Sequence, residues 1–66
     1  MDALELTPTN LRYLLAIYHL SQSRLEVSSK DIAQALAVSR ASVTSMTAIL
    51  AGKRLVAKER YGKVHL

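Results

Sequence analysis

The chain has 66 residues, no Cys and a formal net charge of +4, which excludes disulfides, thiolate metal sites and cysteine nucleophiles. A core of this size rarely supplies more than about 3–5 kcal/mol, so such chains usually rely on a ligand or a partner. Hydrophobic residues make up 50% and aromatic residues only 5%, which favours packed helices over a sandwich of short strands. The sequence therefore predicts one folded domain spanning residues 1–66.

The positive charge lies in the second half of the chain. Residues 1–33 contain three basic and four acidic residues, whereas residues 34–66 contain six basic residues and one acidic residue. A basic half is the electrostatic footprint of a polyanion-binding protein, although many solvated faces are basic too. The N-terminus lacks a basic signal-peptide region, and no apolar stretch approaches the roughly 18–20 residues of a membrane span. We therefore expect a cytoplasmic protein with no membrane partner.

The first expected element is a helix over residues 7–22, which follows an N-terminal arm of residues 1–6. Thr7 is expected to cap this helix, with Pro8 at the first helical position, where a missing N–H does no harm. Apolar residues then recur at helical spacing on a stripe wider than a surface helix needs. That stripe contains Leu11, Leu14, Leu15 and Tyr18, with Ile17, Tyr13 and Leu20 beside it.

Two shorter helices are expected over residues 28–36 and 39–51. Ser28 with Asp31 forms a capping-box pattern, Ser39 is the cap of the next helix, and Gly52 is expected just past its end. After these helices the apolar period changes from 3.6 to 2, which predicts a hairpin over residues 55–66 with its turn near residues 61–63. The predicted fold class is mainly α with a small β-hairpin: a winged helix-turn-helix of three helices plus a wing.

The spacing between the second and third helices is that of a helix-turn-helix. Two helices that cross near 90–120° over a short turn need small or apolar residues at fixed positions. Ala33 is the most restrictive position, because a larger side chain there would push the next helix away, and Ala37 stands where glycine is often found. The positions that fit are Ile32, Ala33, Leu36, Val38, Val43 and Met46.

The outward face of residues 39–51 is the candidate DNA-reading surface. The DNA major groove admits one α-helix, and a helix with small outward side chains can approach the base edges closely. Only Arg40 is long enough for a bidentate contact to guanine, whereas the wing cations suit the sugar–phosphate backbone. A solvated helix face and a solvated basic hairpin are the alternatives. The candidate contacts are Ser39, Arg40, Ala41, Ser42, Thr44 and Ser45 on the helix, and Lys58, Arg60 and Lys63 on the wing.

Over nearly all of residues 6–66 the chain resembles the metal-dependent repressors typified by the diphtheria toxin repressor and the manganese transport regulator. The resemblance implies the amino-terminal winged-helix domain of a bacterial transcriptional regulator that binds a palindromic operator as a dimer. It places the helix residues named above at DNA, and Thr7 and Thr9 at phosphates. The matching segments are Leu6-Thr7-Pro8-Thr9, Tyr13-Leu14, Ala16-Ile17-Tyr18, residues 27–39, Ser42-Val43-Thr44, Met46, Leu55-Val56, residues 59–64 and Leu66.

The chain departs from that family at the regulatory metal. The family's first helix carries three acidic positions that help to hold the ion, and here they are Leu11, Arg12 and Leu15. Leucine cannot ligate a metal, and a guanidinium repels one. The family's other ligands lie in a second, helical dimerisation domain outside residues 1–66. His19 has no acidic residue three or four positions away, and His65 lies on the last expected strand, so neither is expected to be a ligand. We therefore expect no metal and no cofactor.

The leucines of the first helix have two interpretations. Leu11 and Leu15 lie one turn apart, with Leu4 and Leu6 upstream, and they serve either ordinary core packing or contact with another protein surface.

The function predicted from the whole sequence is a metal-independent, sequence-specific DNA-binding regulator, which binds double-stranded DNA as a homodimer or with a partner protein. The alternatives are the DNA-binding half of a longer metal-responsive repressor and a winged-helix module for protein contacts. An enzyme is not expected, because no catalytic triad, phosphate loop or carboxylate pair is evident.

Overall fold

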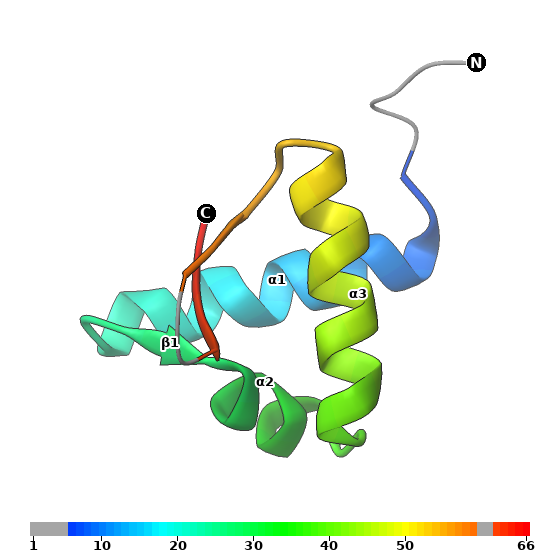
Figure 1. Cartoon of the computed structure of the whole chain (residues 1–66). Coiled ribbons are helices and arrows are strands. Elements are labelled where there is room, and N and C mark those ends of the chain that lie inside the picture. Colours follow the sequence, from blue (N-terminus) through cyan, green and yellow to red (C-terminus); the bar gives the residue numbers. More distant parts are fainter. Residues whose placement is uncertain (1–5, 60–61) are drawn as a thin grey trace.

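Three helices and a small three-stranded sheet make up the fold (Figure 1). The structure is a computed structural model that describes residues 6–59 and 62–66. Each helix starts one residue later than expected, because the capping residue lies just outside the helix it caps. The elements are α1 (Pro8–Ser23), β1 (Val27–Ser28), α2 (Ser29–Leu36), α3 (Arg40–Gly52), β2 (Ala57–Lys58) and β3 (Lys63–His65).

Side-chain caps fix where the helices begin. The Thr7 hydroxyl accepts the Asn10 backbone N–H at 3.0 Å, and the Asn10 side chain accepts the Thr7 N–H at 3.0 Å. Ser28 and Asp31 form the same reciprocal pair at the start of α2, with distances of 3.2 and 3.0 Å. Ser39 caps α3 by accepting a backbone N–H of its first turn. These bonds satisfy donors that the helices cannot satisfy internally, so the entry point of each helix is set locally.

The Asp31 carboxylate at the start of α2 is expected to make the fold less stable as the pH becomes acidic. The Ser28 backbone N–H holds the pKa of Asp31 below its ordinary value, with help from the Ser28 hydroxyl and the nearby Arg24 guanidinium. A lowered folded-state pKa stabilises the fold above the unfolded-state pKa, and that stabilisation is lost as pH falls through the folded-state value. In thermal melts followed by circular dichroism, we expect Asp31→Asn to reduce the decline in Tm below about pH 4. An unchanged acid decline in the variant would contradict this role.

The turn between α2 and α3 forces an alanine into the left-handed region. Ala37 has φ 56° and ψ 45°, and the bonds from the Ala37 N–H to the Gln34 carbonyl and from Val38 to Ala33 form a Schellman-type end. This conformation costs a non-glycine residue roughly 1–2 kcal/mol.

Ala37→Gly should therefore stabilise the fold by about 0.5–1 kcal/mol, after subtraction of the extra freedom that glycine gives the unfolded chain. Thermal unfolding measures this gain. Ala35→Gly is the matched control, because Ala35 lies inside right-handed α2 and the same change there should destabilise by about 0.5–1 kcal/mol. Equal shifts of the two variants would contradict the argument.

The end of α3 differs from the prediction for Gly52. Gly52 is the last helical residue, and the left-handed position falls on Arg54, which has φ 61°. The reason is that Leu55 N–H closes the helix by donating to the Leu50 carbonyl at 3.0 Å, while Arg54 N–H donates to Ala51 at 3.0 Å. The prediction that glycine takes the position past the helix end was wrong by two residues.

The predicted hairpin is present, and a third strand joins it. β2 and β3 pair antiparallel, with Ala57 opposite His65 and Glu59 N–H donating to the Lys63 carbonyl at 2.8 Å. β1 pairs with the other edge of β3, with Val27 opposite Val64, which gives the order β1-β3-β2. A two-residue strand has no period to detect, so it was not expected from the sequence. Arg60 and Tyr61, at the predicted turn, lie outside the described residues.

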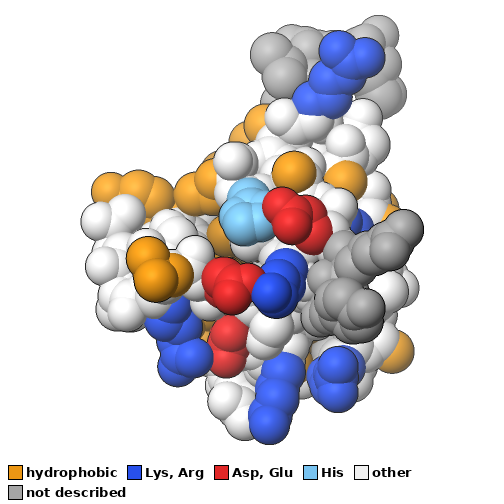
Figure 2. Space-filling view, turned by 60° about the vertical axis from the view of Figure 1, so that its left-hand side comes forward, with side chains coloured by type: hydrophobic (Ala, Val, Ile, Leu, Met, Phe, Trp, Pro, Cys, Tyr) orange, Lys and Arg blue, Asp and Glu red, His pale blue; other side chains and the backbone are white. Residues whose placement is uncertain are grey.

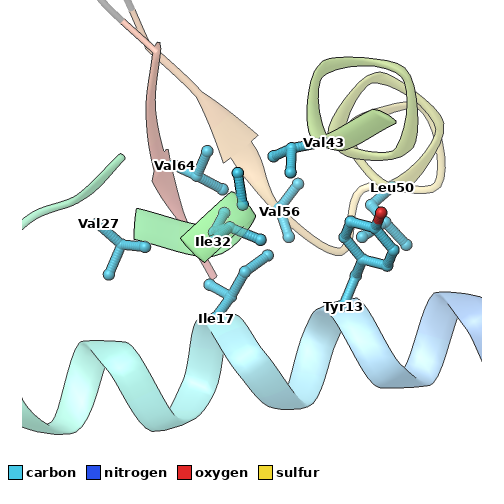
Figure 3. Close-up of a cluster of buried hydrophobic side chains, with 9 residues drawn as sticks. Tyr13, Ile17, Val27, Ile32, Val43, Leu50, Val56 and Val64 are labelled. Atoms are coloured by element: carbon cyan, nitrogen blue, oxygen red, sulfur yellow. The ribbon is translucent and has the colours of Figure 1, made fainter. Parts of the chain in front are cut away.

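The core forms where one face of α1 meets α2, α3 and the sheet (Figure 3). Tyr13 and Ile17 point from α1 into this cluster, whereas Leu11 and Leu15 are 46% and 56% exposed. α1 is thus apolar on two opposite faces, and tertiary contacts cover only one of them. The buried hydrophobic residues are Tyr13, Ile17, Val27, Ile32, Ala33, Val43, Leu50, Val56 and Val64.

Candidate nucleic-acid interface

α2 and α3 have the relation of a helix-turn-helix. The bend between them is 112°, and the turn consists of residues 37–39. Ala33 is buried at their crossing, as the helix-turn-helix pattern requires, and Ile32 is fully buried. The second helix of the pair, α3, stands at one side of the molecule, and α1 passes behind it in the view of Figure 1.

The two faces of α3 differ in burial. Val43, Thr47 and Leu50 have no exposed surface, and the Thr47 hydroxyl is satisfied by donating to the Thr44 carbonyl at 3.2 Å. Most exposed side chains of the opposite face are short, so the helix backbone can be approached closely there. Among them are Arg40, Ala41, Thr44, Ser45 and Ala48, and Ile49, 49% exposed, lies beside them.

The first turn of α3 combines a cap with a cation. Ser39 and Ser42 are both exposed, and their hydroxyl oxygens lie 2.9 Å apart. Ser39 also accepts the Ser42 backbone N–H at 3.0 Å, so its oxygen is occupied by the cap. Arg40 follows directly and is exposed, and no carboxylate among the described residues pairs with it. Its guanidinium is therefore available to an outside acceptor.

A buried polar contact ties the start of α1 to the middle of α3. Asn10 is only 4% exposed, and its side-chain amide donates to the Met46 sulfur at 3.1 Å. The sequence reasoning did not single out Asn10, although its position three residues after Thr7 is a capping-box signal. Thr7 and Thr9, both exposed, are thereby held on the same side of the molecule as α3.

The wing cations have different surroundings. Lys58 on β2 is exposed and has no acidic partner in the described part of the chain. Lys63 on β3 forms an ion pair with Glu26, which raises the pKa of the ammonium group. This partner was not foreseen, because Glu26 approaches Lys63 only through the pairing of β1 with β3. Arg60, the third predicted wing cation, lies outside the described residues.

The described side-chain carboxylates each lie beside a basic residue or a histidine, on or next to the sheet. Asp31 pairs with Arg24 at 3.0 Å, Glu26 pairs with Lys63, and Glu59 lies 2.7 Å from His65. Figure 2 shows acidic and basic side chains alternating on this face. All three carboxylates of residues 6–59 and 62–66 are engaged in this way, so the positive charge that remains includes Arg40 and Lys58.

The donor set of this chain does not fit the metal that its family resemblance implies. Within the residues that the structure describes, no three His, Asp or Glu side chains come together. α1 carries no carboxylate, and the Arg12 guanidinium donates to the Leu36 carbonyl at 3.4 Å. A cation placed here would meet a guanidinium and leucine side chains, which supply no ligand.

The candidate protein-contact leucines have different positions. Leu4 lies outside the described residues, and Leu6 is half-buried. Leu11 and Leu15 are exposed on the side of α1 that faces away from the core. Core packing, one of the two interpretations of these leucines, is therefore excluded for Leu11 and Leu15.

The bent helix pair, the exposed small-residue face of α3 and the three-stranded wing define a winged helix-turn-helix DNA-binding domain. The chain matches the family model described as iron dependent repressor, N-terminal DNA binding domain, over residues 5–64, and it belongs to that family. This is a family of DNA-binding repressor domains and not a class of enzyme. No curated protein and no solved structure matches the chain.

Within residues 6–59 and 62–66, no helix is by itself long and apolar enough to cross a bilayer.

Proposed function

We propose that this chain represses transcription without a bound metal, with α3 in the DNA major groove and the hairpin against the phosphate backbone. The observation that carries the proposal is the outer face of α3, where Arg40 is the single long cation among small exposed side chains. A major groove admits such a helix, and a free guanidinium at its first turn suits the O6 and N7 acceptors of guanine. Thr44 and Ala41 suit thymine methyl groups.

Phosphate contacts are assigned to the hydroxyls and cations around that helix. Ser39, Ser42 and Ser45 are short donors at or near the first turn of α3, and Thr7 and Thr9 lie at the start of α1. Lys58, Arg60 and Lys63 serve the backbone from the wing, and Lys63 exchanges its partner Glu26 for a phosphate.

Metal independence is supported by the chemistry of α1. Its exposed face carries Leu11, Arg12 and Leu15 and no carboxylate, so this face offers no ligand to a divalent ion. We further propose that the protein acts in the cytoplasm, on DNA in the same compartment, and that a second copy or another protein assists it.

Fluorescence anisotropy of labelled duplex DNA over a salt series, with and without Mn²⁺, tests this function. We expect binding without metal, a steep decrease in affinity with salt, and no change on addition of Mn²⁺. Lys58→Ala should weaken binding to all duplexes alike and reduce the salt slope by about one. Absence of binding to any duplex at low salt would overturn the DNA function, and a requirement for Mn²⁺ would overturn metal independence alone.

A further inference from the structure

A second apolar surface lies on α1, opposite the core. Leu11, Leu15 and Tyr18 are 46%, 56% and 49% exposed, and they are spaced four and three residues apart. Tyr13 and Ile17, on the other side of the same helix, point toward α2, α3 and the strands (Figure 3). Since residues two apart on a helix lie on nearly opposite sides, this stripe faces away from α3 and from any DNA bound there.

The stripe continues into a groove between α1 and α2. The groove has a volume of about 410 Å³ and is lined by apolar side chains, including Leu15, Leu20 and Leu36. Alternating steps of four and three residues are the spacing by which one helix packs along another. Because the groove adjoins a stripe with this spacing and shares Leu15 with it, the two together fit a second helix better than a compact ligand.

The polar groups at this groove select the charge of that helix. Arg12 and His19 line the groove, two helical turns apart or about 10 Å along the α1 axis. Arg12 is held in place because it donates one N–H to the Leu36 carbonyl at 3.4 Å, and its other donors are free to meet a carboxylate. α1 has no acidic residue, and the three described carboxylates are paired elsewhere.

We infer that the stripe and groove dock an amphipathic helix of a partner protein that carries acidic residues along one edge. A second copy of α1 fits this surface less well, because it brings another Arg12 and no carboxylate to meet the first. The matching partner presents leucine-like residues to Leu11, Leu15 and Tyr18, and two carboxylates, two turns apart, to Arg12 and His19. This surface is separate from α3, so the inference holds whether or not α3 binds DNA.

The test uses two synthetic helical peptides of about 20 residues, long enough to form a helix in water. Both carry leucines at the four-three spacing, and they differ only in having either Glu or Lys at two flank positions two turns apart. Anisotropy of the labelled peptide measures affinity for the full chain, and ¹⁵N–¹H chemical-shift changes locate the contact. We expect the Glu peptide to bind about five- to tenfold more tightly than the Lys peptide, with shifts confined to α1 and the end of α2.

Two charge reversals separate this docking from general attraction to a basic protein. Arg12→Glu should reverse the peptide preference, whereas Arg40→Glu, the same change on α3, should leave it unaltered. Leu15→Ser should weaken both peptides about tenfold. It should leave thermal stability unchanged, because Leu15 is exposed.

Three results would overturn the inference: equal affinity for both peptides, equal losses from the two reversals, or shifts on α3. Sedimentation as a dimer that Leu15→Ser dissociates would instead assign the face to a second copy.

Discussion

Arg40→Ala is expected to weaken binding to a guanine-containing site by about 1–3 kcal/mol, roughly 5- to 150-fold in affinity, and to relax the choice of base at one position. The reason is that Arg40 is the long donor among the small outer side chains of α3 and has no acidic partner in the described structure. Selection from a random duplex pool supplies the preferred site, and anisotropy on that site and its three single-base variants measures discrimination.

Loss of folding does not account for this expected result. Arg40 is the first residue of α3, where the positive end of the helix dipole disfavours a cation. The alanine variant should therefore melt at the same temperature as the parent or slightly above it. Lys58→Ala serves as the control, because a phosphate contact weakens all four duplexes equally. If Arg40→Ala also weakened all four equally, Arg40 would be a phosphate contact and not a base-reading residue.

Leu50→Ala is expected to cost about 2–5 kcal/mol of folding free energy, which is comparable to the whole stability of so small a domain. Leu50 has no exposed surface, and it lies in the core between α3 and α1. Its carbonyl also closes α3 by accepting Leu55 N–H. Alanine leaves that bond in place, so the loss measures side-chain packing alone. The variant should be largely unfolded at physiological temperature by circular dichroism.

The neighbouring residue provides a matched control for this prediction. Ile49 is 49% exposed on the same turn of α3, and Ile49→Ala removes a similar amount of side chain from a half-solvated site. Its cost should stay within about 0.5 kcal/mol. Urea titrations of both variants check the difference. Similar midpoints for Leu50→Ala and Ile49→Ala would contradict the assignment of Leu50 to the structural core.

The absence of metal ligands on α1 has a consequence for how repression would be controlled. In a metal-dependent repressor, an ion changes the DNA-competent population of the protein; here α1 carries Leu11, Arg12 and Leu15 where the resemblance to that class implies acidic ligands. Two of these residues, Leu11 and Leu15, form the exposed stripe together with Tyr18. A protein helix docked on that stripe would replace a metal ion as the controlling signal. It would act on the exposed face of α1, opposite the face that packs into the core.

Features that depend on near neighbours could be predicted from the amino-acid sequence. Thr7, Ser28 and Ser39 were identified as caps because a cap bonds to a backbone N–H only three residues away. The helix-turn-helix was also evident, since its crossing restricts residues within one short window, such as Ala33. Helical periodicity also predicted which residues lie on the outer face of α3, because the apolar residues of that helix share the opposite face.

Features that depend on residues far apart in the chain became evident only from the three-dimensional fold. α1 is apolar on two sides, and contacts with α2, α3 and the sheet select the Tyr13 and Ile17 side for burial, which leaves Leu11 and Leu15 in solvent. β1 forms because it pairs with the edge of β3, which begins 36 residues further along the chain. In this pairing Val27 lies opposite Val64, and Ser28 lies opposite Lys63. The pairing of Glu26 with Lys63 follows from that strand. Local patterns fix where a helix starts and which residues share a face, but which face is buried depends on what the rest of the chain places against it.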